Sequence, residues 1–364
     1  MRIVYVLTSL GMGGAEKQAL AVAERMEKRG HTVALLVLRP RLAEEWPTTL
    51  DTIHMEMRKT PASLFTGLSR ARRFLRAFRP DLLHGHSFHA NLFARCLGLP
   101  FLRRRVISTI HNVFEGGWPR VLAYRLTDPL SQLTVAVSEA VAQRFIHIRA
   151  VPAKKCLVIT NGIDIAEFAP DPARRMRIRA ELDPASERRD FIWLAAGRVV
   201  PAKDYPNLLR AFRQVREALP DVELWIGGAA SHSVIEIVVE HGYQEKVRWL
   251  GMRREMPTLL DAADAFVSAS AWEGMPLAVG EAMAMAKPVV ATDVGGVCEL
   301  VGEAGIAVPP RDSAALAKAM IATVQRSAEE RAESGRRARD RIKQQFSIET
   351  RADAWEALYR KLLA

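Results

Sequence analysis

Short apolar runs alternate with amphipathic segments along the first half of the chain. We predict strands over residues 3–7, 32–38, 53–57, 81–84, 106–110, 133–137 and 156–160, with one helix after residue 14 and another over 62–78. The runs are rich in β-branched and aliphatic residues, which is typical of strands buried on both faces. Helices between such strands indicate βαβ units and a parallel sheet.

A second cycle with the same pattern follows. Strands are predicted over residues 191–196, 222–226, 247–250, 265–268 and 289–291, and residues 314–364 have only helical patterns. Residues 170–190 are charged, contain proline and lack a strand pattern, so we place a linker near 166–172. The sequence therefore predicts an α/β protein with two doubly wound domains, 1–168 and 169–347, that face each other across a cleft. Open α/β sheets bind ligands at the carboxyl ends of their strands.

Length and composition agree with this organisation. The chain has 364 residues and 49% hydrophobic content, more than one core usually holds. Cys96, Cys156 and Cys298 form no CxxC motif, which favours a reducing compartment without disulfides. No signal peptide and no apolar run of about 18 residues is present, so we expect a soluble or peripheral protein.

The positive charge is confined to the first half. Residues 1–168 hold 24 Lys and Arg against 13 Asp and Glu, a net charge of +11, whereas residues 169–364 hold 28 of each. The helix over 62–79 combines an apolar stripe with five arginines, and residues 100–105 add a second basic and apolar patch. These features favour an anionic membrane surface as partner, although a sheet-covering helix with a solvated basic face has the same pattern. Nucleic acid is disfavoured because no basic segment carries interleaved aromatic residues.

Residues 270–281 contain two carboxylates, Glu273 and Glu281, on either side of a Gly-Met-Pro turn. Pro276 suits the first turn of a helix over about 276–286, where unpaired backbone N–H groups attract anions. A carboxylate accepts both hydroxyl groups of a diol. A ligand with diols at each end and a diphosphate between, such as a nucleotide sugar, fits this segment. Alternatively, both glutamates are solvated surface residues.

Arg198 and Lys203 flank a short turn after the strand over 191–196. Two cations at a strand end would neutralise a diphosphate and the charge that develops on it as a glycosyl–phosphate bond breaks. The alternative is a pair of solvated surface cations.

Glycines 11, 13 and 14 open the first predicted helix and would let phosphate approach the backbone closely. The loop lacks the Gly-Lys-Ser/Thr of a P-loop, and Glu16 stands at the last position of a dinucleotide fingerprint. Arg39 leaves an NADP site as a rival, for which we find no hydride substrate site.

Several histidines fall in the first domain. His111 follows a strand and precedes a loop with a large aromatic residue, which suits contact with a sugar hydroxyl or with the acceptor; a packed histidine is the alternative. His84, His86 and His89 also cluster. No carboxylate or cysteine completes a ligand set there, so a metal site is disfavoured.

Together these segments make the chain similar to a known family, the retaining family-4 glycosyltransferases of the GT-B fold. The resemblance covers nearly the whole length. It is carried by Gly13-Gly14-Ala15-Glu16, His111-Asn112, Ser138-Glu139, Asn161-Gly162-Ile163-Asp164, Gly197-Arg198 with Lys203, residues 270–281 and Thr292-Asp293-Val294-Gly295-Gly296.

The resemblance implies roles for these residues. Arg198 and Lys203 would contact the donor diphosphate, Glu281 the ribose, and Glu273 the transferred sugar, towards which His111 would face. Further substrate contacts are implied for Gly13, Gly14, Ser138, Asn161, Gly274, Met275, Pro276 and Leu277. Retention would proceed by front-face attack without an enzyme nucleophile, so the paired-carboxylate scheme of glycoside hydrolases is not transferred.

The resemblance also implies which cofactors, substrates and cellular location to expect. Neither a metal nor another cofactor is expected, and residues 348–364 would pack back onto the first domain. The donor would be a nucleotide-diphosphate sugar, with UDP favoured, and the acceptor a glycan or a lipid-linked sugar in capsule, O-antigen or exopolysaccharide synthesis. We expect a cytoplasmic enzyme, peripheral to the inner face of the plasma membrane. A sugar-nucleotide epimerase of the same fold and a non-catalytic nucleotide-sugar-binding partner remain alternatives.

Overall fold

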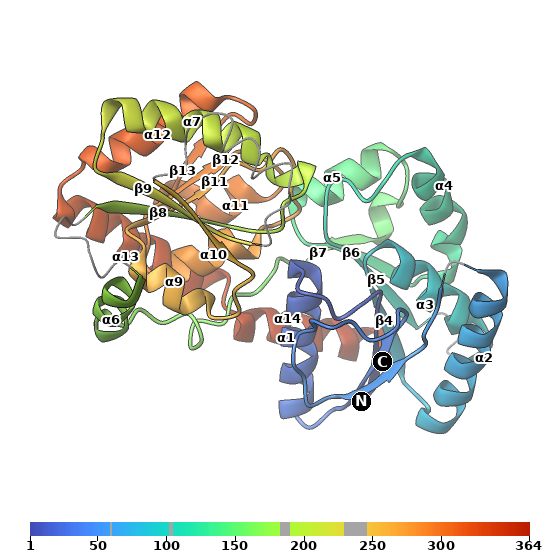
Figure 1. The fold of residues 1–364 in the computed structure, drawn as a ribbon. Coiled ribbons are helices and arrows are strands. Elements are labelled where there is room, and N and C mark those ends of the chain that lie inside the picture. The colour runs from blue at the N-terminus through green and yellow to red at the C-terminus, as the bar shows by residue number, and fades with distance from the viewer. Residues whose placement is uncertain (59, 102–104, 183–189, 229–245) are drawn as a thin grey trace. The chain divides into compact units, whose positions relative to one another are not determined.

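The computed structural model describes residues 1–58, 60–101, 105–182, 190–228 and 246–364. They form two compact units (Figure 1). Unit 1 consists of Met1–Gly162 with Ile348–Ala364, and unit 2 is Ile163–Ser347. The division lies a few residues before the predicted boundary at 168, and the terminal helix belongs to unit 1.

Unit 1 is built on seven parallel strands in the order β3-β2-β1-β4-β5-β6-β7. The strands are β1 (Arg2–Leu7), β2 (Thr32–Val37), β3 (Asp51–His54), β4 (Leu82–His86), β5 (Val106–Ile110), β6 (Leu133–Ala136) and β7 (Cys156–Val158). The helices are α1 (Gly14–Lys28), α2 (Pro61–Phe78), α3 (Phe88–Phe101), α4 (Trp118–Thr127), α5 (Glu139–His147) and α14 (Ile348–Leu363), with short turns η1 (Asp128–Leu130) and η2 (Ala153–Lys155).

Both faces of this sheet are buried, as the unbroken apolar runs predict. In β1, Ile3 and Tyr5 belong to a core shared with α1 and α14, whereas Val4 and Val6 belong to a core shared with α2 and α3. Successive residues of a strand point to opposite faces, so one apolar run supplies both cores.

Unit 2 has six parallel strands in the order β10-β9-β8-β11-β12-β13. The strands are β8 (Phe191–Ala196), β9 (Val222–Gly227), β10 (Val247–Gly251), β11 (Ala265–Ser268), β12 (Val289–Thr292) and β13 (Ile306–Val308). The helices are α6 (Pro172–Leu182), α7 (Tyr205–Ala218), α9 (Met256–Ala262), α10 (Leu277–Ala284), α11 (Val297–Val301), α12 (Ser313–Gln325) and α13 (Ala328–Gln345), with turns η3 (Pro201–Lys203) and η4 (Gly302–Ala304).

The predicted fold class is confirmed, since both units are parallel α/β sheets with helices on their faces. Three details differ from the sequence prediction. Strand β3 spans Asp51–His54 rather than residues 53–57. The prediction does not include the edge strand β13, which has three residues. Residues 172–182, which follow the predicted linker and for which no element is predicted, form helix α6, whose arginines pair with Asp261 and Asp264.

Strand order reverses once in each sheet. The first strand lies between later neighbours, with β1 between β2 and β4 and β8 between β9 and β11. The loops that leave adjacent strands diverge at such a switch point and leave room for a ligand. The predicted site residues of unit 2 follow these strands or the next one in the sheet. In unit 1, Gly14 follows β1 and His111 follows β5, whereas Ser138 and Asn161 follow β6 and β7, further from the switch point.

Helix α14 completes the core of unit 1. Trp355 is buried beside the ring of His84, with 4.6 Å between ring centroids. The hydroxyl of Tyr359 lies 3.0 Å from that of Tyr5 and 2.7 Å from Nδ1 of His84. At its exposed edge, α14 is paired with α1 through Arg29, whose Nη1 lies 2.7 Å from a carboxylate oxygen of Asp353.

Replacement of Trp355 by Ala should destabilise unit 1 by about 3–5 kcal/mol, because it leaves a large cavity between α14 and the sheet. Faster hydrogen exchange of the β1 and β4 amides should report this loss of stability. Lys361→Ala, an exposed position on the same helix, is the matched control and should leave exchange unchanged. Unchanged β1 and β4 protection in Trp355→Ala would contradict the role of α14 in this core.

Candidate functional site

The carboxyl ends of β8 and β9 meet at two glycines. Gly197, directly after β8, has a φ of +150°, and its carbonyl oxygen accepts a hydrogen bond of 2.9 Å from the Tyr205 hydroxyl. A Cβ on Gly228 would lie 2.1 Å from that same carbonyl oxygen. Side chains at these two positions are therefore excluded, and the two loops stay in backbone contact.

Lys203 and Glu273 form an ion pair at this edge. Nζ of Lys203, at the end of η3, lies 2.6 Å from Oε1 of Glu273 on the loop after β11. The Ser270 hydroxyl donates to the same oxygen at 2.8 Å. No described residue donates to the other oxygen, Oε2. Glu273 is largely buried, so loss of Lys203 would leave a buried carboxylate without its countercharge.

Backbone contacts fix the loop that carries Glu273. The Ala271 N–H donates to the Ala202 carbonyl at 2.8 Å, and the Gly296 N–H donates to the Gly274 carbonyl at 2.6 Å. Gly295 has a φ of +58°, and a Cβ there would lie 2.2 Å from the Glu273 carbonyl oxygen. The three loops that follow β8, β11 and β12 are thus held together around one carboxylate.

The predicted helix after Pro276 is confirmed as α10, with Pro276 at its N-cap. Gly274, Met275 and Pro276 are buried, while Leu277 in the first turn is partly exposed. Glu281 lies in the second turn and is buried. Unit 2 therefore brings together the helix start and both carboxylates that the sequence singles out.

Arg198 is the exposed cation of the group. It directly follows Gly197, and no described residue forms a hydrogen bond or an ion pair with its guanidinium. Its charge is therefore open to a ligand, in contrast to the charge of Lys203.

In unit 1 the glycine loop precedes α1 with Gly13 as its N-cap. The Glu16 carboxylate folds back over this glycine, so that a Cβ on Gly13 would lie 2.3 Å from Oε2. The Gly13 carbonyl accepts a hydrogen bond from Nε1 of Trp46 at 3.2 Å. Gly14 remains exposed.

His111, directly after β5, is partly exposed and continues a row that contains the buried His86 and His84. Its Nε2 lies 3.0 Å from Nδ1 of His86, and burial lowers the pKa of His111 to about 4, so the ring is neutral at pH 7. Burial also lowers the pKa of His84 and of His86.

The histidine row has structural bonds of its own. Both ring nitrogens of His84 are engaged at 2.7 Å, one by Tyr359 and the other by Thr109. Among the described residues, no group of three or more His, Cys, Asp or Glu has the arrangement of a metal site.

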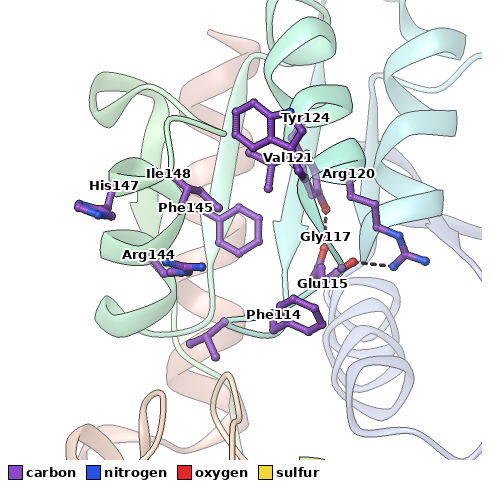
Figure 2. Close-up of a pocket in the computed structure, with 13 residues that line it drawn as sticks. Phe114, Glu115, Gly117, Arg120, Val121, Tyr124, Arg144, Phe145, His147 and Ile148 are labelled. Carbon is purple, nitrogen blue, oxygen red and sulfur yellow. Dashed lines mark hydrogen bonds between the residues drawn. The ribbon is translucent and has the colours of Figure 1, made fainter.

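Glu115 lies on the loop after His111. One carboxylate oxygen accepts from the His111 backbone N–H at 3.1 Å. The other accepts from the Tyr124 hydroxyl at 2.6 Å (Figure 2). Asn91 in turn donates to the Tyr124 hydroxyl at 3.0 Å. Burial raises the pKa of Glu115 to about 7, and the bonds from Tyr124 and His111 oppose this rise only in part.

Two predicted substrate contacts are buried in unit 1. The Ser138 hydroxyl caps α5 by accepting from the Val141 N–H at 3.2 Å, and the residue is fully buried. Asn161 is buried beside Gly162, whose N–H donates to the side chain of Gln18.

Sequence reasoning missed the partners that hold these groups. Tyr205 in unit 2 and Tyr124 in unit 1 position the site through hydroxyl groups that no sequence motif singles out. Ser270 lies in the motif over residues 270–281, but only its hydrogen bond to Glu273 reveals its purpose. Gly295 lies in the motif over residues 292–296, but only its positive φ and its contact with Glu273 reveal its purpose.

Two family models match the chain. The model for Glycosyltransferase Family 4 matches residues 12–167, and the model for Glycosyl transferases group 1 matches residues 190–326. The first match lies mostly in unit 1 and the second lies in unit 2.

Several curated proteins are similar in sequence. An Escherichia coli UDP-Gal:α-D-GlcNAc-diphosphoundecaprenol α-1,3-galactosyltransferase is 27% identical, over 62% of this chain and 60% of that enzyme. Glycogen synthase of Mycobacterium tuberculosis is 29% identical, over 78% of this chain and 69% of that enzyme. The chain thus spans less than two thirds of the length of the galactosyltransferase.

Solved structures share the fold over nearly the full length. HepE of Anabaena in complex with UDP-glucose superposes with a TM-score of 0.83 at 22% identity, covering 98% of this chain and 99% of that one. WaaG, a glycosyltransferase involved in lipopolysaccharide biosynthesis, gives a TM-score of 0.76 at 16% identity, with 97% and 99% covered.

The raised pKa of Glu115 predicts a pH-dependent contribution to stability. In the unfolded chain this carboxyl loses its proton near its ordinary pKa of 4.5, whereas in the folded protein it keeps the proton up to about pH 7. The wild type should therefore lose stability relative to Glu115→Gln as the pH rises from 4.5 to 7, by at most about 1.4 kcal/mol per pH unit, with no further change above 7. Denaturant unfolding of both proteins from pH 4.5 to 8 measures the difference, and a constant difference would contradict the prediction.

Proposed function

The chain belongs to the family-4 glycosyltransferases, and we propose that it transfers a sugar from a UDP-linked donor to a glycan or lipid-linked acceptor with retention of anomeric configuration. We assign the donor to unit 2 and the acceptor to unit 1. The observation that carries the proposal is the cluster of Arg198, Lys203 and Glu273 at the carboxyl edge of the unit 2 sheet.

The cluster suits a sugar joined to a diphosphate. Arg198 offers an uncompensated guanidinium, which binds phosphate oxygens through two parallel hydrogen bonds. Oε1 of Glu273 is already engaged by Lys203 and Ser270, so Oε2 is the oxygen that accepts sugar hydroxyl groups. Glu281 accepts the ribose hydroxyls.

Lys203 has two partners in this scheme. Without donor it neutralises Glu273, and with donor it also faces the diphosphate, where negative charge grows as the glycosyl–oxygen bond breaks. Fixed cations aimed at developing charge stabilise the transition state more than the ground state. Arg198 and Lys203 therefore take the role that a divalent metal has in other enzymes, and we propose that neither a metal nor another cofactor is required.

The surroundings of Glu273 favour a positioning role. Oε1 of Glu273 is held by Lys203 and Ser270, and the proposal gives Oε2 to the sugar hydroxyl groups, so neither oxygen is assigned to attack on the anomeric carbon. We propose front-face attack, in which the acceptor hydroxyl enters on the side from which the diphosphate leaves and a phosphate oxygen takes its proton. This route retains configuration without an enzyme nucleophile.

In unit 1 we assign Gly14 to phosphate contact and His111 to the sugar. Gly14 is exposed, whereas the Glu16 carboxylate fills the space beside Gly13 and would repel an anion there. Nε2 of the neutral His111 ring is engaged by His86, which leaves Nδ1 for one hydrogen bond with a sugar hydroxyl. We assign three further residues to the border of this site, namely Gly13, Ser138 and Asn161.

The names of the relatives support the choice of substrates. The E. coli galactosyltransferase uses a UDP-sugar and a diphosphoundecaprenol-linked acceptor, and HepE was solved with UDP-glucose. We propose a UDP-sugar and a lipid-linked or glycan acceptor in cell-surface polysaccharide synthesis. Since transferases recur among the relatives, transfer is favoured over epimerisation.

We further propose that unit 1 binds an anionic membrane at the cytoplasmic face of the plasma membrane. Helix α2 and its C-cap expose Arg70, Arg72, Arg73, Arg76 and Arg79, and Phe65 near the start of the helix is 74% exposed. Of the predicted second patch at 100–105, Leu102, Arg103 and Arg104 lie outside the described residues. Within the described chain, no helix is both long and apolar enough to cross a bilayer.

Arg198→Ala should lower kcat by about 10²–10³-fold, because it removes one of two cations that stabilise the departing diphosphate. Folding should be unaffected, since Arg198 has no partner among the described residues. Steady-state transfer in the presence of EDTA measures the effect, with Arg210→Ala on the exposed face of α7 as the matched control.

Four results would contradict the proposed transfer reaction or one of its assignments. Full activity of Arg198→Ala would remove the diphosphate assignment, and loss of all activity in EDTA would remove the metal-independent one. Conversion of a UDP-sugar without acceptor would favour the epimerase, and donor binding without any turnover would favour a non-catalytic partner.

The membrane proposal predicts that Arg72→Gln/Arg76→Gln weakens binding to vesicles that contain phosphatidylglycerol. Each cation near an anionic surface contributes about 1 kcal/mol, so affinity should fall about thirtyfold. Co-sedimentation with these vesicles at low and high salt measures the affinity. Arg336→Gln/Arg337→Gln, which removes the same charge from α13, should bind like the wild type. Equal binding to phosphatidylcholine vesicles would contradict the proposal.

A further inference from the structure

Unit 1 contains a pocket that the proposed chemistry does not use. It has a volume of about 360 Å³ and lies between α4, α5 and the loop that follows β5 (Figure 2). We call it the α4–α5 pocket. Its apolar lining comes from Val113, Phe114, Trp118, Val121, Phe145 and Ile148. The Phe145 ring points into the space between the two helices.

The apolar surface continues from the pocket along the outside of α4. Phe114, Trp118, Leu122 and Leu126 are spaced four residues apart and are 54%, 64%, 40% and 70% exposed. Single exposed apolar residues are ordinary, but three at helical spacing on α4, continued by Phe114 on the loop before it, form a patch of the kind that marks an interaction surface. A long apolar ligand that enters the pocket would therefore remain in contact with apolar side chains outside it.

The charged groups of the pocket favour an anion. Arg120, Arg144 and His147 line it, and Glu115 is its only carboxylate among the described lining residues. The Arg120 guanidinium donates to the Glu115 carbonyl at 2.5 Å and is therefore already engaged. Arg144 is exposed, and no described residue bonds to its guanidinium. The Glu115 carboxyl is turned towards Tyr124 and His111, so it does not oppose an anion at Arg144.

The pocket also adjoins the predicted acceptor side of the enzyme. Glu115 lines the pocket and accepts a hydrogen bond from the His111 backbone, so a single side chain connects the pocket with the histidine assigned to the sugar. A ligand anchored in the pocket would hold its polar end on the loop that carries His111.

We propose that the α4–α5 pocket binds the hydrocarbon chain of a lipid phosphate, the apolar part of a lipid-linked acceptor, and that Arg144 binds the phosphate. The proposal rests on the function proposed above and names its acceptor class. A bilayer alone would cover the stripe on α4 without filling the pocket, whereas a single chain fills the pocket and leaves along the stripe.

Dodecyl phosphate, below its micellar concentration, is the probe, and the emission of Trp118 in the pocket wall is the readout. We expect a saturable blue shift in the wild type that is absent from Trp118→Phe. Arg144→Gln removes the phosphate partner, and Val121→Phe fills the pocket. Each should weaken binding about tenfold or more, because a charged hydrogen bond or the apolar volume is lost.

Two controls distinguish binding in this pocket from nonspecific adsorption of the probe. Arg125→Gln, an exposed charge on α4 outside the lining, should bind like the wild type, and inorganic phosphate should produce no shift. Thermal unfolding of Val121→Phe establishes that the variant folds. Equal affinity in the wild type, Arg144→Gln and Val121→Phe would overturn the proposal, as would a shift only with vesicles or with inorganic phosphate. Binding is measured without donor, so a failure of sugar transfer would leave this readout intact.

Discussion

Parallel strands place all their carboxyl ends on one edge of a sheet, and the chemistry of this protein depends on that constraint. In unit 2 it brings the loops after β8, β11 and β12 together, so that Lys203 and Glu273 meet although 70 positions separate them in the sequence. The close approach of these loops also explains why glycine is required in them. Gly228 and Gly295 lack side chains because the neighbouring backbone occupies the space that a Cβ would need. In unit 1 the same edge carries the glycine loop, His111 and Glu115.

The sequence predicts the sheets well because their strands are buried on both faces, and such strands form apolar runs that leave little doubt. It misses the edge strand β13 of unit 2, although it predicts β7, an edge strand of the same length in unit 1, so strand length alone does not decide the outcome. Helix α6 is strongly basic, and its packing depends on Asp261 and Asp264, which lie some 85 residues further along the chain. A local pattern cannot report such partners.

The candidate site shows the same difference between what a local pattern reveals and what depends on distant partners. Glu273, Glu281, Arg198 and Lys203 are recognisable by residue type and by their place after strands, but their bonds are not. The sequence does not show that Lys203 neutralises Glu273, or that Glu16 folds over Gly13. Nor does it show that the Ser138 hydroxyl caps a helix and that both nitrogens of His84 are engaged. Those assignments need the structure because each depends on a second residue that no motif identifies.

Helix α14 has a consequence for how the chain is made. Unit 2 is one continuous stretch and completes its core as soon as residue 347 is available, whereas unit 1 needs Trp355 and Tyr359 to close the face of its sheet over β1 and β4. During translation, the first 162 residues therefore leave the ribosome long before their last partner exists. We therefore expect unit 1 to complete its fold last, although its first 162 residues are synthesised first.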